Sequence, residues 1–267
     1  MHKISVITIN YNNVSQIRRT LESVSSQTYS NLEWIIIDGG STDGSVDIIK
    51  EYESKITYWV SEPDKGIYNA MNKGVRRATG DYCIFINSGD HFVNSHSVED
   101  AVNCNFDTDL AIFNIYYNNT RKMSFVPQRI TTSFLFRKSI PHQSTIIRRQ
   151  MLLNTPYDET LRIASDWTFC MDTIIFKHCS YKTFKLPISI FYQDGISFKN
   201  NDLNISERIS YINSKLPQEM YEEYESMNGY ALFCLEQLSP FFNKIAIKII
   251  LLLYSVNKRL YRFNSDK

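Results

Sequence analysis

The chain has 267 residues, of which 43% are hydrophobic and 21% charged, and its net charge is +1. These proportions are typical of a globular protein and exclude a disordered chain, and the near-neutral charge argues against nucleic acid as the main partner. Five cysteines without a C-x-x-C pair lack the spacing of a metal site or a disulfide framework. The first residues lack the pattern of a signal peptide, so we expect a cytoplasmic protein with reduced thiols.

Strand-like and helix-like segments alternate four times in the first 90 residues. Short apolar runs rich in β-branched residues predict buried strands at residues 4–9, 32–38, 56–60 and 82–86. A helix capped by Asn12 or Asn13 should follow the first strand, because Ile17, Leu21 and Val24 recur at helical spacing. Further helices are predicted at residues 45–53 and 68–78, and Gly80 is expected to end the latter in a left-handed conformation.

This alternation predicts an α/β fold with a parallel, doubly wound sheet and right-handed crossovers. Such sheets bind ligands beyond the carboxyl ends of their strands. Asp38, the segment from Glu62 to Gly66, and Asp90 all fall at those ends and should converge on one edge. The chain has neither G-x-G-x-x-G after its first strand nor a G-x-x-x-x-G-K-[ST] loop, which argues against a dinucleotide dehydrogenase and a P-loop NTPase.

Several segments together resemble one known family. Residues 5–12 (SVITINYN) and 37–45 (IDGGSTDGS) resemble the first two strand ends of family 2 glycosyltransferases. Residues 61–74 (SEPDKGIYNAMNKG) and 87–90 (NSGD) resemble the colanic-acid-type branch of bacterial polysaccharide glycosyltransferases. Further motifs of that branch follow in order at His142-Gln143, Tyr157-Asp158, Ala164-Ser165-Asp166 and Asp194-Gly195-Ile196-Ser197. The resemblance covers about the first 200 residues and implies a GT-A fold that transfers a sugar from a nucleoside diphosphate sugar with inversion.

The resemblance implies a divalent cation, Mn²⁺ or Mg²⁺, that bridges the leaving diphosphate. Carboxylates hold such ions, and Asp90 at the end of the fourth strand is the candidate ligand. Many relatives have D-x-D or two adjacent aspartates at this point, whereas this chain has Ser88-Gly89-Asp90.

The resemblance also assigns donor contacts. Asp38 is expected to accept a hydrogen bond from the nucleotide base, and both uracil and guanine offer suitable N–H groups. Asp64 and Lys65 lie where relatives enclose the nucleotide, and Lys65 is suited to neutralise phosphate. The other expected donor contacts are Thr8, Asn10, Asn69 and Ser88.

Inversion requires one direct attack by an acceptor hydroxyl and one general base. Asp166 is the candidate base, because it begins a predicted helix where relatives carry their catalytic carboxylate. His142 is expected to complete the metal or diphosphate site, and Gln143 to contact donor or acceptor.

Each of these assignments has a structural alternative. Asp38 and Asp90 also suit turns, Asp166 suits a helix cap, and His142 suits a structural hydrogen-bonded histidine. For Asp43 the helix-terminal role is favoured, whereas Asn69 and Asn72 fit loop support as well as ligand contact. Two other functions stay open: a nucleotidyltransferase of sugar-nucleotide metabolism, and a sugar-nucleotide-binding subunit without catalysis.

The last quarter of the chain is predicted to be helical. We expect a catalytic domain at residues 1–200, with a nucleotide-sugar half at 1–100 and an acceptor half at 101–200, followed by a helical region at 201–267. Its predicted helices are 206–216, 218–225, 230–238 and a tail at 240–267. The tail has six basic residues and one acidic, a net charge of +5. Five of the basic residues share one helical stripe, namely Lys244, Lys248, Lys258, Arg259 and Arg262. We expect this amphipathic tail to contact the inner face of the cytoplasmic membrane, near a lipid-linked saccharide acceptor, with packing on protein as the alternative.

Overall fold

The structure is a computed structural model that describes residues 2–118, 122–192, 200–217, 222 and 226. The chain divides into two compact units, residues 1–208 and 209–267. Within the described residues, no helix is both long and apolar enough to cross a membrane.

The first unit is built around one mixed β-sheet of nine strands among the described residues. The strands are β1 (Ile4–Asn10), β2 (Leu32–Asp38), β3 (Tyr58–Ser61), β4 (Tyr82–Phe85), β5 (His91–Phe92), β6 (Leu110–Tyr117), β7 (Lys122–Met123), β8 (Thr145–Arg148) and β9 (Tyr181–Phe191). Their order is β3-β2-β1-β4-β8-β6-β9-β5, and β7 pairs with β6. The first four strands are parallel, which confirms the parallel block predicted from the alternation.

The strand direction reverses at β8, in the second half of the sheet. Strand β8 is antiparallel to both of its neighbours, β4 and β6, while β9 runs parallel to β6. The short strand β5 then closes that edge in antiparallel pairing with β9. The sheet is therefore mostly parallel, with β8 as a single reversed strand in its centre.

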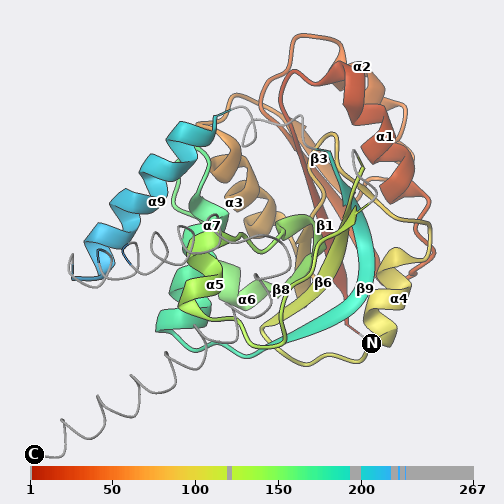
Figure 1. Ribbon diagram of the computed structural model, residues 1–267. Helices are drawn as coiled ribbons and strands as arrows, with labels where there is room; N and C mark the ends of the chain where they lie inside the picture. Colours follow the sequence, from red (N-terminus) through yellow and green to blue (C-terminus); the bar gives the residue numbers. More distant parts are fainter. Residues whose placement is uncertain (1, 119–121, 193–199, 218–221, 223–225, 227–267) are drawn as a thin grey trace, which may run out of the picture. The chain divides into compact units, whose positions relative to one another are not determined.

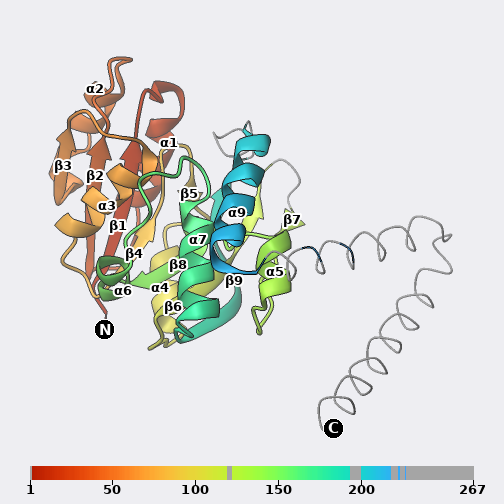
Figure 2. The ribbon, with the colours of Figure 1, turned by 90° about the vertical axis from the view of Figure 1, so that its left-hand side faces the viewer.

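Helices cover both faces of this sheet (Figure 1; Figure 2). The helices of the described residues are α1 (Val14–Ser25), α2 (Ser45–Lys50), α3 (Ile67–Arg77), α4 (Ser97–Asn103), α5 (Thr132–Arg137), α6 (Arg149–Asn154), α7 (Ser165–Cys170) and α9 (Asn201–Lys215), with short 3₁₀ turns at Glu53–Lys55 and His142–Ser144 (η2) and a π-helical segment at Met171–Phe176. Helices α1, α2 and α4 lie on one face, and α3, α6 and α7 on the other (Figure 1).

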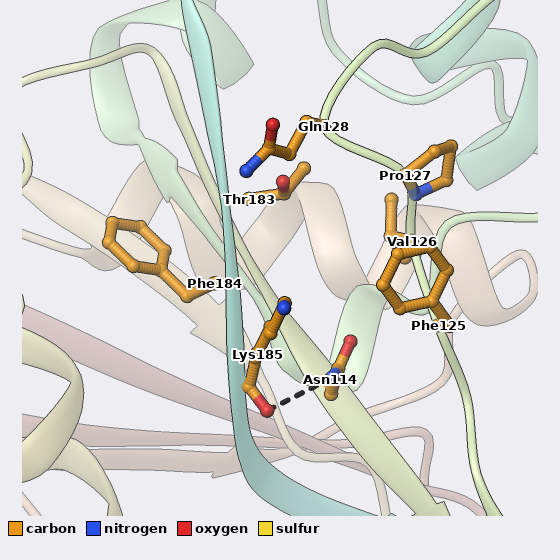
Figure 3. Close-up of a pocket in the computed structure, with 8 residues that line it drawn as sticks. All are labelled: Asn114, Phe125, Val126, Pro127, Gln128, Thr183, Phe184 and Lys185. Carbon is orange, nitrogen blue, oxygen red and sulfur yellow. Dashed lines mark hydrogen bonds between the residues drawn. The ribbon is translucent and has the colours of Figure 1, made fainter.

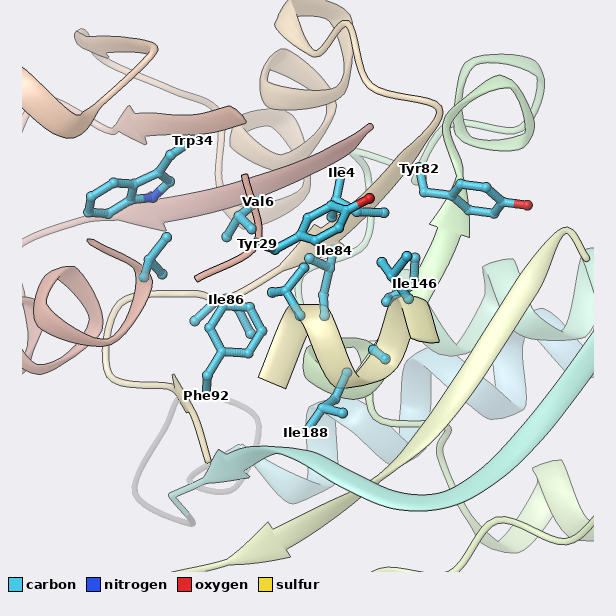
Figure 4. Close-up of a cluster of buried hydrophobic side chains, with 14 of the residues drawn as sticks. Ile4, Val6, Tyr29, Trp34, Tyr82, Ile84, Ile86, Phe92, Ile146 and Ile188 are labelled. Carbon is cyan, nitrogen blue, oxygen red and sulfur yellow. The ribbon is translucent and has the colours of Figure 1, made fainter. Parts of the chain in front are cut away.

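The main hydrophobic core lies on the face covered by α1 and α4 (Figure 4). The predicted apolar positions of α1, which are Ile17, Leu21 and Val24, are all buried there. They pack in one cluster with strand side chains such as Val6 and Ile84. Burial of each large aliphatic side chain stabilises the fold by about 1.5–3 kcal/mol, and this holds α1 against the sheet.

Two local predictions are wrong. Gly80 is not a left-handed helix stop: α3 ends at Arg77, and a Cβ on Gly80 would lie 2.5 Å from Ser5 Oγ and 2.8 Å from the Lys3 carbonyl oxygen. Close approach to β1 therefore requires this glycine. The side chain of Asn13 does not cap α1, since Asp43 Oδ2 accepts from the Val14 N–H at 2.7 Å instead.

Other segments differ from the prediction in their bounds. The predicted helix 45–53 is shorter, because α2 ends at Lys50, and the predicted strand 56–60 corresponds to β3 at Tyr58–Ser61. The predicted helix 206–216 corresponds to α9. Apart from Glu222, the remaining C-terminal predictions and the motif at 194–197 lie outside the described residues.

Candidate active site

Polar side chains gather where the parallel strands end. Asn10 and Asp38 are the last residues of β1 and β2 and face each other in register, and Ser61 ends β3 beside Asp38. The turn from Asn87 to Asp90 follows β4, the other neighbour of β1. The parallel pairing thus brings the predicted carboxylates to one edge of the sheet.

Asp38 organises the loop that follows β2. Its carboxylate is fully buried and accepts from Asn10 Nδ2 at 2.7 Å, from the hydroxyls of Ser41 and Ser61 at 2.6 Å each, and from the backbone N–H groups of Gly40 and Ser41. Burial alone would raise the pKa of Asp38, but these hydrogen bonds lower it overall. The ionised form is therefore favoured, and its contact with a nucleotide base stays a prediction.

Asn10 presents an acceptor at the same edge. Its amide nitrogen is oriented by Asp38, which only accepts when ionised. Asn10 Oδ1 is buried and has no hydrogen-bond partner among the described residues. A buried acceptor without a partner is costly, so this atom is suited to receive an N–H or O–H group from a ligand or a water molecule.

Helix α1 holds the turn between β4 and Asp90. Gly89 adopts a left-handed φ of 107°, and its carbonyl oxygen accepts from Arg19 Nη2 at 2.5 Å and Nε at 3.1 Å. Thr20 Oγ1 donates to the Asp90 carbonyl oxygen, and Asn13 Nδ2 donates to the Ser88 carbonyl and hydroxyl oxygens. The turn that carries the candidate metal ligand is thus fixed by side chains of one helix.

Asp166 lies in the first turn of α7, with 21% of its side chain exposed. Its Oδ1 lies 2.9 Å from the Trp167 backbone nitrogen and 3.1 Å from the Tyr68 hydroxyl, and its Oδ2 lies 3.1 Å from His142 Nδ1. Burial would raise the pKa of Asp166, but the His142 hydrogen bond, the nearby Arg208 charge and Tyr68 lower it overall. An ionised, partly exposed carboxylate is able to accept a proton from a bound hydroxyl.

The 3₁₀ turn η2 contacts both candidate carboxylates. His142 faces Asp166 through Nδ1 and lies 3.2 Å from Asn87 Nδ2 through Nε2. The next residue, Gln143, donates from Nε2 to Asp90 Oδ2 at 3.0 Å. Two consecutive side chains therefore link the turn after β4 to the start of α7, and their predicted diphosphate and acceptor contacts stay predictions.

Two residues of α9 support the segment before Asp166. The Glu207 carboxylate accepts from the backbone N–H groups of residues 162, 163 and 164 at 2.7, 3.0 and 2.9 Å. The guanidinium of Arg208 lies 4.9 Å from the Trp167 ring centroid and donates to Ser139 Oγ. Neither residue was predictable from the sequence, because they belong to no motif and their contacts depend on where this part of α9 packs.

Known proteins are similar to this chain in sequence. The model of "Glycosyl transferase family 2" matches residues 5–170. This chain belongs to glycosyl transferase family 2. An uncharacterized glycosyltransferase of Mycobacterium tuberculosis is 30% identical over 72% of this chain and 76% of its own length. A Mycobacterium bovis protein named as a PGL/p-HBAD biosynthesis glycosyltransferase is 27% identical over 62% of this chain and 67% of its own length.

Solved structures show that the fold is GT-A, as predicted. S. aureus TarS in complex with UDP-GlcNAc has a TM-score of 0.63 at 20% identity, covering 83% of this chain and 70% of that fragment. This chain spans 42% of the longer TarS structure. A mannosyltransferase from Pyrobaculum calidifontis in complex with GDP-Man and Mn²⁺ has a TM-score of 0.58 at 16% identity, covering 97% of this chain and 83% of that one.

The other residues expected to contact the donor of this family 2 protein differ in burial and in their hydrogen-bond partners. Thr8 is fully buried, and its hydroxyl accepts from Trp34 Nε1 at 3.1 Å. Asp64 accepts from the Gly66 N–H, which shapes the loop before α3, and Lys65 is exposed.

Asn69 and Asn72 tie α3 to a distant loop. Asn69 accepts from the Lys65 N–H and donates to Glu159, while Asn72 donates to Glu159 and to the Tyr157 carbonyl oxygen. These contacts agree with the loop-support alternative for both asparagines, and the donor contact of Asn69 stays a prediction.

The residues fit a divalent cation only in part. No group of three or more His, Cys, Asp or Glu side chains suited to a metal occurs within the described residues. Asp90 is 8% exposed and has one carboxylate oxygen directed at Gln143, and both ring nitrogens of His142 already have protein neighbours. A cation at Asp90 would therefore need ligands from the donor diphosphate and water.

A hollow of about 330 Å³ lies elsewhere, between β9 and the segment 125–128 (Figure 3). Its floor includes Asn114, whose amide donates to the Lys185 carbonyl oxygen where the β6–β9 pairing is irregular. None of the predicted site residues lines this hollow. The candidate active site is thus defined by the strand-end carboxylates.

Proposed function

We propose that this protein is an inverting glycosyltransferase that moves a hexosyl group from a nucleoside diphosphate sugar to a hydroxyl of a saccharide acceptor. The single observation that carries this proposal is Asp166. It combines a lowered pKa, partial exposure and three oriented neighbours at the sheet edge where Asp90 also lies. An ionised carboxylate with access to solvent and a fixed orientation is able to accept the proton of a bound hydroxyl.

In the proposed reaction, the acceptor hydroxyl gives its proton to Asp166 while its oxygen attacks the anomeric carbon. The bond from that carbon to the diphosphate breaks, and its electron pair leaves on the phosphate oxygen. A divalent cation held by Asp90 would supply positive charge for the leaving diphosphate. Asp166 needs to be ionised and to keep a fixed orientation. Its hydrogen bonds to His142 and to the Trp167 N–H stabilise the ionised form and fix that orientation.

Similar proteins support a UDP- or GDP-linked donor. The TarS structures contain UDP-GlcNAc or UDP, and the Pyrobaculum mannosyltransferase contains GDP-Man and Mn²⁺. The buried acceptor Asn10 Oδ1 has no hydrogen-bond partner among the described residues and fits the N–H groups of either base, and Asp38 orients the amide that carries it. The M. bovis relative is named for PGL/p-HBAD biosynthesis, and we extend the proposal to a role in bacterial surface-polysaccharide synthesis.

The test is calorimetric binding of UDP and GDP, each with and without Mn²⁺, to wild type, Asp90→Ala and Asp166→Asn. We expect one nucleotide to bind with Mn²⁺ and to lose that dependence in Asp90→Ala. Asp166→Asn should bind the nucleotide normally and turn over about 10²-fold more slowly or worse, the usual contribution of a general base. Full activity of Asp166→Asn, or no nucleotide binding to wild type, would refute the proposal.

We further propose that the acceptor is lipid-linked and that the basic tail at 240–267 holds the protein on the inner face of the cytoplasmic membrane. The tail's net charge of +5 suits anionic lipid. Removing residues 240–267 should move the protein from the membrane to the soluble fraction. Unchanged sedimentation of the truncated protein with membranes would contradict this part of the proposal.

A further inference from the structure

We propose that His142 is a positioning residue for Asp166. In this role it holds the carboxylate of the base toward the acceptor hydroxyl through an Nδ1–H hydrogen bond, and Asn87 fixes the ring tautomer that this bond needs. The inference rests on the proposed function, because it takes Asp166 as the general base. It differs from the expectation that His142 contacts a metal or the diphosphate.

The neighbours of the ring determine where its hydrogen lies. Asp166 Oδ2, 3.1 Å from Nδ1, belongs to an ionised carboxylate and only accepts, so Nδ1 must carry the hydrogen. Asn87 directs its amide nitrogen at Nε2 from 3.2 Å, which fits a lone pair on Nε2. Together these contacts favour the ring form with its hydrogen on Nδ1.

Both ends of this chain of contacts are anchored. Asn87 belongs to the turn that α1 holds through Gly89 and Asp90. His142 sits in η2, where the Pro141 carbonyl oxygen accepts from the Ser144 N–H at 3.1 Å and the Thr145 hydroxyl at 2.9 Å. The imidazole is 17% exposed. It therefore has a fixed backbone, a fixed partner on each nitrogen and little freedom to turn.

This arrangement fixes the orientation of the Asp166 carboxylate. Its Oδ1 is held by the Trp167 N–H on its own helix and lies beside the Tyr68 hydroxyl. Without His142, the Oδ2 side would have no oriented donor among the contacts described for it. Only the contacts at Oδ1 would then restrain the terminal bond of the carboxylate, which has a broad energy minimum. Because small misplacement of a reacting group slows catalysis strongly, loss of this hydrogen bond should lower kcat and leave donor binding intact.

Two substitutions distinguish the roles of the two ring nitrogens of His142. In His142→Asn, the amide nitrogen takes a place comparable to Nδ1 and is able to donate to Asp166 Oδ2. In His142→Gln, the amide reaches a place comparable to Nε2, so it keeps the Asn87 side and loses the Asp166 side. The matched control is His178→Asn, since His178 has a left-handed φ of 53° that Asn tolerates and belongs to none of the site contacts described above.

The kinetic assay measures release of nucleoside diphosphate from UDP-GlcNAc and from GDP-mannose, with water as the acceptor. We expect His142→Asn to keep kcat within about threefold of wild type, and His142→Gln to lose about tenfold or more with an unchanged KM. Equal losses in both variants would show a merely structural role. A raised KM with normal kcat would show a direct donor contact, and either result overturns the inference.

A second measurement does not depend on turnover. Nitrogen NMR of the ¹⁵N-labelled histidine rings, with the His142 signals identified as those missing from His142→Asn, reports which ring nitrogen carries hydrogen. We expect Nδ1 to carry hydrogen in wild type, and a ring with hydrogen on Nε2 alone would overturn the inference. Full activity of Asp166→Asn would instead refute the proposed function while leaving the tautomer result standing, so the two failures are distinguishable.

Discussion

Replacing Glu33 with Gln should destabilise the protein strongly at neutral pH. Glu33 lies in β2, is 4% exposed, and accepts from Ser5 Oγ, the Thr79 N–H and hydroxyl, and the Gly80 N–H at 2.5 to 3.0 Å, beside Lys3 Nζ at 2.9 Å. Burial would raise the pKa of Glu33, but these donors and the Lys3 charge lower it from 4.5 to about 2. The carboxylate thereby joins β1, β2 and the connection from α3 to β4.

The lowered pKa sets the size and sign of the effect. A change from 4.5 to about 2 corresponds to about 3 kcal/mol of stability, at about 1.36 kcal/mol per pKa unit. Because the folded-state pKa lies below the unfolded value, this stability is fully present above about pH 5 and is lost as the pH falls toward 2. At pH 3, a little more than half of it should be gone.

Urea unfolding of wild type and Glu33→Gln at pH 7 and at pH 3 measures this contribution. We expect the variant to be less stable by about 3 kcal/mol at pH 7 and the gap to shrink by about 2 kcal/mol at pH 3. Asp47→Asn is the control, since that side chain is 82% exposed and should change stability by no more than about 0.5 kcal/mol. A gap that does not change with pH would refute the reasoning.

Two further substitutions test other contacts. Gly80→Ala should lower the free energy of unfolding in urea by about 1–3 kcal/mol, because the new Cβ would meet Ser5 Oγ and the Lys3 carbonyl oxygen. A gain in stability would contradict the close approach of Gly80 to β1. Glu207→Gln should cost about 1–3 kcal/mol, because an amide N–H₂ would face at least one of three backbone N–H groups, and it should slow nucleoside diphosphate release more than Asp202→Asn on the same helix.

The first half of the fold was predictable because its information is local. Apolar runs and helical periodicity give the strands and α1, and the alternation then requires parallel pairing. Asp38 and Asp90 could be placed at one edge from this alone. Gly80 shows the limit of local reasoning: a glycine after a helix suggests a left-handed stop, whereas its packing against β1 decides its role here.

The contacts of the candidate base could not be predicted in this way. His142 and Asp166 lie 24 positions apart, and Glu207 contacts residues more than 40 positions before it. Such contacts depend on how η2, α7 and α9 pack, and no periodicity encodes this. The motifs marked His142 and Asp166 separately, but the hydrogen bond between them, and hence the positioning role, required the three-dimensional structure.

The reversed strand β8 explains why η2 reaches both carboxylates. Because β8 pairs antiparallel with β4, with Tyr82 opposite Arg148 and Cys83 opposite Ile147, β8 begins at the edge where β4 ends. The residues just before β8, which are those of η2, must therefore lie beside the residues just after β4. A parallel strand at this position would have begun at the opposite edge. His142 and Gln143 would then lie the length of a strand away from Asn87 and Asp90. The reversal at β8 thus joins the turn after β4 to the proposed base, and it is the reason that consecutive side chains contact Asp166 and Asp90.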